Sequence, residues 1–326
     1  MPETDLLEIR ELTVDLMSPR GIVYALGGVN LKLGRGEIHG LVGESGCGKT
    51  MTARTILHLL DEKRSRIRGE ILFEGRDLLK LSNREMASIR GKRIAMIFQD
   101  PAASLNPLFT VGEQIEETIR QHEKISAKEA RKQTLSLLER VGIYPAGKRY
   151  GQYPHELSGG LQQRVMIAIA ISTRPSLLIA DEPTTALDVT IQAQVLSLLK
   201  DLAGELGMSV LLITHNFGIV AEICSRVSVM YAGRIVETAC VKELFDRAAH
   251  PYTRALIRSI PGTGKTGEYL PTIPGIPPQL YEKEEGCAFY ERCSERSERC
   301  RSKPKAIEIS PGHWTECTMH QDGLCN

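Results

Sequence analysis

A glycine-rich octapeptide between an apolar segment and a helix-compatible one constrains the fold more than any other feature of the sequence. Residues 43–50 read Gly-Glu-Ser-Gly-Cys-Gly-Lys-Thr, which fits the pattern G-x-x-x-x-G-K-[ST]. The apolar run 38–42 comes directly before them, and the helix-compatible segment 49–60 follows. A strand, a glycine-rich turn and a helix in this order predict an α/β crossover whose turn binds phosphate. The alternative, a chance glycine turn, does not explain the flanking pattern.

The residue types of this loop each suit a nucleotide phosphate. Its glycines let the backbone fold closely, so that successive N–H groups and the helix N-terminus face the anion. Lys49 supplies a point charge for the β- and γ-phosphates, and the Thr50 hydroxyl can bind Mg²⁺. Cys47 is expected to be a small filler and not a nucleophile. The predicted nucleotide-binding residues here are Gly43, Glu44, Ser45, Gly46, Cys47, Gly48, Lys49, Thr50 and Met51.

Two short apolar runs later in the chain are followed by polar residues. Residues 176–180 and 210–214 have the pattern of central parallel strands that are buried on both faces. Asp181 and Glu182 follow the first run, and His215 follows the second. Open parallel sheets place their sites at the carboxyl ends of strands, and acids there need a cation or a proton partner. These three residues are therefore predicted to be catalytic or metal-binding.

Residues 157–164 read Leu-Ser-Gly-Gly-Leu-Gln-Gln-Arg and identify the family. A serine with two glycines at a helix start predicts another set of anion-facing N–H groups. The stretch resembles the signature sequence of ATP-binding cassette (ABC) ATPases. The resemblance implies that Ser158, Gly159, Gly160 and Gln162 contact the nucleotide held by an opposite subunit, so that hydrolysis requires a head-to-tail pair.

The same resemblance assigns roles to the remaining motif residues. It implies that Asp181 holds Mg²⁺ through water together with Thr50 and Gln99, and that Glu182 is the general base. Gln99 matches the glutamine loop, which reaches the metal and the attacking water. Asp188 matches the loop that crosses the dimer interface, and His215 the histidine that orients the water and the γ-phosphate.

The resemblance covers about residues 6–258, and at one position the sequence departs from the pattern of the family. The family usually stacks adenine on an aromatic residue near the position of Leu16, which is aliphatic in this chain. Tyr24 is the nearest aromatic residue and the alternative adenine contact.

Further segments narrow the class of transporter. Residues 96–101 with 104–107, and residues 270–278 with Gly286 and Cys287, resemble the D-type ATPases of dipeptide, oligopeptide and nickel importers. Such systems pair two ATPase subunits, usually different ones, with two membrane permeases and an external binding protein. The resemblance implies a peripheral location on the cytoplasmic face of the membrane. Import of nickel or another small solute is the alternative, and a soluble cassette ATPase is a more distant one.

Charge and hydropathy argue against a nucleic-acid-binding protein and against a membrane-spanning one. The chain has 41 Lys and Arg against 40 Asp and Glu, so no general basic field exists for nucleic acid. The apolar stretch 165–171 is far shorter than the roughly 18 residues that a membrane span needs, and the first residues do not resemble a signal peptide. The chain is expected to be cytosolic by synthesis.

Five of the eight cysteines follow residue 286. Cys287, Cys293, Cys300 and Cys317 have five, six and sixteen residues between them, wider than the paired knuckles that usually bind zinc. The spacing favours a [4Fe–4S] cluster with a structural role. Zinc with help from His313 or His320, free thiols, and a redox-sensing role of the tail are the alternatives.

The sequence thus predicts an α/β fold: a phosphate-loop ABC ATPase core with an antiparallel β subdomain, an inserted helical subdomain and a small metal-binding C-terminal extension. Alternating apolar residues in 7–16 and 29–33 predict the antiparallel strands. The predicted domains are 1–258, a nucleotide-binding domain with the helical subdomain at about 100–173, and 259–326, a connector and cysteine-bearing extension. Four prolines in residues 271–278 predict a stiff, extended connector.

Overall fold

The computed structural model describes residues 5–185, 187–260, 273–278, 281–282 and 285–324. The chain divides into two compact units. The first contains the residues up to Gly34, His39–Lys80 and those from Ile213 onward, and the second contains Arg35–Ile38 and Leu81–Leu212. Each unit is described by itself.

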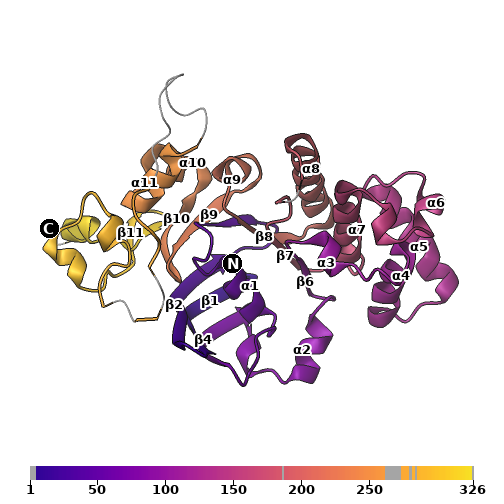
Figure 1. Ribbon diagram of the computed structural model, residues 1–326, viewed down its shortest axis with the longest axis horizontal. Helices are drawn as coiled ribbons and strands as arrows, with labels where there is room; N and C mark the ends of the chain where they lie inside the picture. Colours follow the sequence, from indigo (N-terminus) through magenta and orange to yellow (C-terminus); the bar gives the residue numbers. More distant parts are fainter. Residues whose placement is uncertain (1–4, 186, 261–272, 279–280, 283–284, 325–326) are drawn as a thin grey trace. The chain divides into compact units, whose positions relative to one another are not determined.

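An antiparallel sheet opens the first unit (Figure 1). Its strand order is β2-β1-β4-β5, and the predicted alternation is present because Leu7, Ile9, Leu12 and Val14 of β1 are buried. The two antiparallel strands predicted for residues 7–16 and 29–33 are therefore confirmed, although both are longer than predicted. The elements are β1 (Leu7–Ser18), β2 (Gly21–Leu33), β4 (Ser65–Phe73), β5 (Arg76–Asp77) and the short η1 (Leu78–Lys80).

The other strands of the first unit have the order β11-β12-β10-β9-β3, with β3 parallel to β9. Strands β9 and β10 form an antiparallel hairpin. The two strands of the tail were not predicted: β12 pairs with β10, Glu237 opposite Thr315 and Thr238 opposite Trp314. These elements are β3 (Ile38–Val42), β9 (Arg226–Tyr231), β10 (Arg234–Cys240), β11 (Ile307–Ser310), β12 (His313–Thr315), α1 (Lys49–Ile56), α9 (Phe217–Ile223), α10 (Val241–Arg247) and α11 (Pro251–Arg258), with η3 (Tyr290–Arg292), η4 (Glu298–Arg301) and η5 (Thr318–Leu324) in the tail.

An aromatic cluster joins the tail to the first unit. The Tyr231 ring of β9 lies 4.6 Å from that of Tyr252 in α11 and 5.2 Å from that of Phe289 in the tail, measured between centroids. All three residues belong to one buried apolar cluster with Val229 and Val236. Burial of rings of this size contributes much of the packing energy of a core. The tail is therefore packed into the unit over an apolar face.

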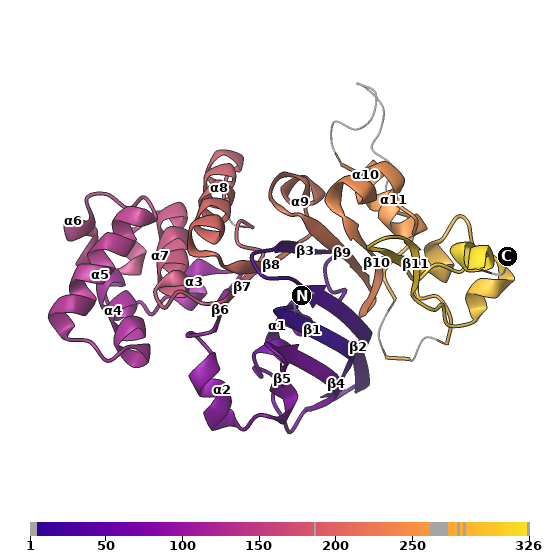
Figure 2. The same ribbon diagram turned by 180° about the vertical axis from the view of Figure 1, so that it is seen from behind.

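The second unit combines buried strands with a group of helices (Figure 2). Its strand order is β8-β7-β6, and β6 and β7 are parallel. Within the helical subdomain predicted at about residues 100–173, Thr110 and Ser126 each cap the start of a separate helix. The elements are α2 (Asn83–Ile89), β6 (Ile94–Ile97), α3 (Pro101–Ser104), α4 (Val111–His122), α5 (Ala127–Arg140), α6 (Ala146–Tyr150), η2 (Pro154–Glu156), α7 (Gly159–Ile171), β7 (Leu177–Asp181), α8 (Val189–Leu206) and β8 (Ser209–Thr214).

Within the described residues, no helix has the length and apolar character needed to cross a membrane. Of the proline-rich connector, residues 271 and 272 lie outside the described part of the chain, and residues 273–278 contain neither helix nor strand.

Candidate nucleotide-binding and catalytic site

The glycine-rich loop lies between β3 and α1, as predicted. Gly46 and Gly48 have φ values of 79° and 112°, in the region that favours glycine. A Cβ atom on Gly43 would lie 2.1 Å from the backbone oxygen of Met230, so the loop passes too close to β9 for any side chain at this position. The sequence therefore forms a tight loop whose backbone is fixed by β9.

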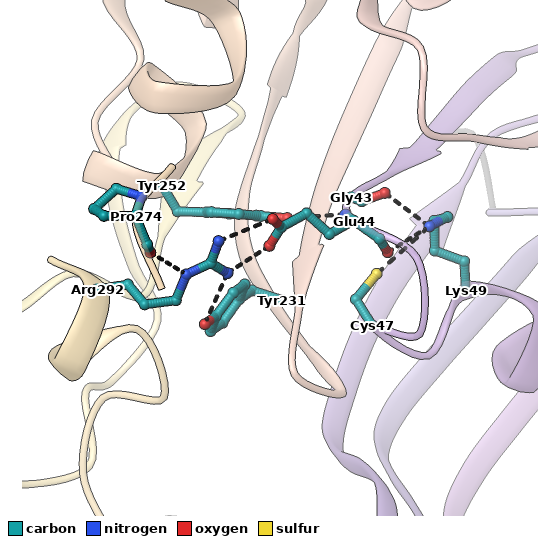
Figure 3. A network of polar contacts seen from close by, with 8 residues as sticks. All are labelled: Gly43, Glu44, Cys47, Lys49, Tyr231, Tyr252, Pro274 and Arg292. Atoms are coloured by element: carbon teal, nitrogen blue, oxygen red, sulfur yellow. Dashed lines mark hydrogen bonds and ion pairs between the residues drawn. The ribbon is translucent and has the colours of Figure 1, made fainter. Parts of the chain in front are cut away.

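Lys49 is only 5% exposed and is held by the loop itself. Its Nζ donates to the backbone oxygens of Gly43 at 2.8 Å and Glu44 at 2.9 Å (Figure 3). Cys47 is buried beside it, and burial raises the pKa of the Cys47 thiol. A thiol in this state is a poor nucleophile, which agrees with the packing role predicted for Cys47.

The predicted acidic pair ends a strand of the second unit. All residues of β7 are buried, Asp181 at its end is 3% exposed, and Glu182 follows with φ 46°. Positive φ values at residues other than glycine are uncommon and often occur at functional sites. Glu182 Oε2 accepts hydrogen bonds from Gln99 Nε2 at 2.9 Å and Thr185 Oγ1 at 2.8 Å. The structure thus brings together the predicted general base and the predicted glutamine-loop residue.

The predicted signature segment forms the start of α7. Ser158 is the N-cap residue, but its side chain makes no capping hydrogen bond, unlike those of Thr110 and Ser126. A Cβ atom on Gly160 would lie 2.8 Å from Ile191 Cγ2, so this glycine also allows close packing of α7 against α8. Gln162 Nε2 donates to the backbone oxygens of Pro154 and Leu157, at 2.9 and 3.2 Å. The side-chain amide of Gln162 thus holds the segment 154–157 against the start of α7, a role that the sequence did not suggest.

The predicted site residues Asp188 and His215 each lie after a strand and before the helix that follows it. Asp188 caps α8, where its Oδ1 accepts from the backbone N–H of Ile191 at 2.9 Å. His215 is exposed directly after β8.

The two candidate adenine contacts lie on the β1–β2 hairpin. Leu16 pairs with Val23, and Tyr24 pairs with Asp15 in the next cross-strand position. Leu16 and Tyr24 are both partly buried.

Four tail cysteines lie around one small pocket, which His250 and Phe289 also line. They are the four predicted metal ligands, Cys287, Cys293, Cys300 and Cys317, and each is a free thiol. Burial raises the pKa of the Cys287 thiol to about 11, and it also raises the pKa of Cys293 and of Cys317. Thiols with raised pKa values must lose protons to bind a metal. Four cysteines are the number and kind of donors that a [4Fe–4S] cluster requires.

The predicted metal-binding character of the extension is nevertheless not confirmed. In the part of the chain that the structure describes, no three or more His, Cys, Asp or Glu side chains are grouped so that they could hold a metal ion. The two histidines suggested as zinc ligands also make other contacts. His313 has both ring nitrogens on carboxylates, Nε2 2.7 Å from Glu237 and Nδ1 3.4 Å from Glu243, and His320 Nε2 lies 3.2 Å from the backbone oxygen of Ala249.

Sequence reasoning missed a contact between the tail and the phosphate loop. Arg292 forms two hydrogen bonds with the Glu44 carboxylate, and the Glu44 backbone N–H donates to the Tyr252 hydroxyl at 2.9 Å. Arg292 precedes Cys293 in a segment with several charged residues, so no local signal distinguished it from its neighbours.

A phosphate loop between strand and helix, an acidic pair at the end of a buried strand and a glycine-rich helix start define the class of protein. They are the parts of a nucleotide-binding ATPase cassette. Comparison with known proteins agrees. Residues 26–185 match the family model described as ABC transporter, and residues 236–300 match the model of the oligopeptide/dipeptide transporter C-terminal region.

Similar curated proteins extend this match over nearly the whole chain. A probable peptide ABC transporter ATP-binding protein of Sinorhizobium fredii is 51% identical over 97% of this chain and 96% of its own length. The oligopeptide transport ATP-binding protein OppD of Bacillus subtilis is 48% identical over 98% of this chain and 90% of its own length. The chain therefore belongs to the ATP-binding proteins of the ABC transporter family, and it is an ATPase.

A solved structure shows the same fold. A dimeric ATP-binding cassette in a post-hydrolysis state, bound to ADP and phosphate, is 29% identical and has a TM-score of 0.65. The match covers 72% of this chain and 98% of that one, so the fold of the cassette is confirmed.

Proposed function

We propose that this chain is the ATP-hydrolysing subunit that drives import of dipeptides or oligopeptides through a membrane permease. The observation that carries this proposal is the match of residues 236–300 to the C-terminal region of oligopeptide and dipeptide transporters. Relatives named for peptide or dipeptide transport, including the dipeptide transport ATP-binding protein DppD of Bacillus subtilis at 46% identity over 96% of this chain, support it.

The proposed catalytic roles follow the motif residues. The loop residues 43–51 bind the phosphates of ATP, and Thr50, Gln99 and Asp181 place Mg²⁺. Glu182 takes a proton from the attacking water, and its hydrogen bond from Gln99 Nε2 fixes the carboxylate in the orientation needed for that step. His215 orients the water and the γ-phosphate.

The proposed assembly is a pair of cassettes on two permease subunits. Ser158, Gly159, Gly160 and Gln162 of each cassette face nucleotide bound by the other, and Asp188 lies at the interface. The Ser158 side chain makes no capping hydrogen bond to α7. This supports the proposed role, because the hydroxyl does not have to leave its own helix to contact nucleotide. The second cassette is a related, different subunit, and an external peptide-binding protein delivers the substrate. Association with the permeases places the chain at the cytoplasmic face of the membrane.

The proposed domains are residues 1–258, the nucleotide-binding domain with its helical subdomain at about 100–173, and residues 259–326, the extension. Within the extension, Cys287, Cys293, Cys300 and Cys317 would hold a [4Fe–4S] cluster, which would supply structural cross-linking to a segment with little core of its own. Their arrangement around one pocket supports the cluster, and the positions of His313 and His320 disfavour zinc.

Transport in reconstituted vesicles tests the proposed function. The permeases, both ATPase subunits and the binding protein are incorporated into liposomes, and uptake of labelled peptides of two to five residues and of ⁶³Ni²⁺ is measured with ATP supplied to this subunit. ATP-dependent uptake of peptide, lost in Glu182→Gln, is the expected result. Uptake of nickel without uptake of peptide would refute peptide import and favour the small-solute alternative.

Metal analysis tests the cluster separately. Anaerobically purified chain should contain about four irons and four sulfides and should absorb visible light, and Cys293→Ser should lose both properties. Cys240→Ser is the matched control, because Cys240 is an exposed thiol on β10. One zinc without sulfide would contradict the cluster while leaving the ATPase assignment unchanged.

A further inference from the structure

A side chain of the C-terminal extension reaches the phosphate loop. Arg292 Nη1 lies 2.6 Å from Glu44 Oε2, and Nη2 lies 3.0 Å from Glu44 Oε1 (Figure 3). The two residues are separated by 248 positions in the sequence. Two parallel hydrogen bonds between guanidinium and carboxylate form the strongest and most directional kind of ion pair in proteins.

The remaining surroundings of Arg292 hold the guanidinium in this orientation. Its Nε donates to the backbone oxygen of Pro274 at 2.9 Å, and Nη1 lies 3.3 Å from the Tyr231 hydroxyl. The guanidinium carbon is 5.7 Å from the centre of the Tyr231 ring and 6.0 Å from that of Phe289. The side chain is 5% exposed. The Glu44 side chain is 26% exposed, so the pair is partly shielded from water. An ion pair that is fixed on several sides in this way differs from the mobile surface pairs that contribute little.

Glu44 is held by its backbone as well. Its N–H donates to the hydroxyl of Tyr252, whose ring is fully buried against Tyr231 and Phe289. The carbonyl oxygen of Glu44 in turn accepts from Lys49 Nζ at 2.9 Å. A shift of Glu44 would therefore move one of the two carbonyl groups that position the phosphate-binding lysine.

We propose that Arg292 is a positioning residue of the ATP site, through which the extension sets the affinity for ATP. It holds Glu44 in place and neutralises a carboxylate that the loop brings next to its phosphate-binding backbone. Without Arg292 this carboxylate would repel the triphosphate, and repulsion between charges is strong in a partly buried site. The inference concerns ATP binding by this chain, so it does not depend on the identity of the transported solute.

Equilibrium binding of a fluorescent ATP analogue to the full-length chain tests the proposal. Arg292→Gln is expected to raise the Kd about 10-fold, because it removes both the positioning and the neutralisation. Glu316→Gln is the matched control. Glu316 also joins the tail to the body through a partly buried arginine, with Oε2 3.1 Å from Arg234 Nε and side-chain exposures of 11% and 15%. The Arg234 guanidinium also donates to the Gly27 oxygen, which lies outside the loop. Glu316→Gln should lower the melting temperature as Arg292→Gln does and leave the Kd within about twofold.

A second substitution separates positioning from simple loss of stability. Adding Glu44→Gln to Arg292→Gln removes the unpaired carboxylate and should restore at least half of the lost affinity on a logarithmic scale, although it adds nothing to stability. Arg292→Lys should bind with intermediate affinity, because an ammonium neutralises the charge without the two-point contact. An unchanged Kd in Arg292→Gln, an equal rise in Glu316→Gln, or no recovery in the double variant would overturn the proposal.

Discussion

A buried carboxylate joins the tail strands to the hairpin. Glu237 of β10 and His313 of β12 have side-chain exposures of 0% and 1%, and their Oε1 and Nε2 atoms lie 2.7 Å apart. Glu237 also accepts from the backbone N–H groups of Ala249 at 2.6 Å and His250 at 2.9 Å. Glu237→Gln keeps the shape of the side chain but removes its charge and presents an N–H group to one of these donors.

The expected cost of Glu237→Gln is about 3 kcal/mol, which is typical when one partner of a buried ion pair is removed. The cost should appear as easier local opening of the β10–β12 pairing. At 1.36 kcal/mol for each factor of ten, hydrogen-exchange protection of residues 313–317 should fall about 100-fold. The amide of Glu316, which donates to the Val236 oxygen at 2.8 Å, is the most informative probe. Protection within about threefold of the unmodified chain would refute the reasoning.

The same pair predicts how stability depends on pH. Burial alone would lower the pKa of His313, but contacts with Glu237 and Glu243 outweigh it and raise that pKa above its usual value of 6.5. Burial alone would likewise raise the pKa of Glu237, but hydrogen bonds from His313 and from backbone N–H groups lower it below 4.5. The neighbouring His250, whose pKa complete burial lowers to about 4, is neutral near pH 7.

A histidine with a raised pKa stabilises the fold fully below its unfolded pKa and loses this contribution as pH rises through the folded pKa. A glutamate with a lowered pKa stabilises above its unfolded pKa and loses this contribution as pH falls. The pair is thus most stabilising between about pH 4.5 and 6.5. The difference in melting temperature between the unmodified chain and His313→Gln should be larger at about pH 6 than at about pH 9. A difference that grows with pH would contradict the assignment.

Two substitutions test the nucleotide site. Glu182→Gln should retain ATP binding and lower the turnover number by about 10²-fold or more, measured by phosphate release; unchanged hydrolysis would exclude Glu182 as the general base. Gly43→Ala should weaken ATP binding at least about 10-fold, because the new Cβ atom meets the Met230 backbone oxygen at 2.1 Å. Gly147→Ala, where a Cβ atom meets nothing within 4 Å, is the control, and equal ATP binding by both alanine variants would show that the close approach does not matter.

The parts of the fold that could be predicted are those encoded by neighbouring residues. The glycines at 46 and 48 have positive φ values, and the strand before them and the helix after them lie where hydrophobic pattern placed them. The buried strand ending at Asp181 was predicted for the same reason, because its apolar run is continuous in the sequence. The hydrogen bond between Gln99 and Glu182 was not predicted. Family resemblance placed Gln99 only near the metal and the attacking water, and 83 positions separate the two residues in the sequence.

The tail shows why the rest could not be predicted. The strands β11 and β12 have four and three residues, too few for a periodic pattern to indicate them, and β12 is placed by its pairing with β10. Arg292 is one of several charged residues between Cys287 and Cys300. Its importance depends on the distant residues that meet it in three dimensions, namely Glu44, Tyr231 and Pro274.

Three charge pairs between tail and body converge on neighbouring strands. Arg292 pairs with Glu44, two residues after the end of β3. Glu316 pairs with Arg234 and His313 with Glu237, and both of these partners belong to β10. Because β3, β9 and β10 are consecutive in the strand order, these pairs and the aromatic cluster around Tyr231 connect the tail with the sheet that supports the phosphate loop. Loss of one partner of a buried pair is costly, so the pairs at Glu316 and His313 anchor the tail to the sheet. The pair between Arg292 and Glu44 instead reaches the loop itself. We therefore infer that the extension fixes the loop in the geometry that binds ATP through Arg292, and that loss of this one contact would weaken nucleotide binding before it unfolded the cassette.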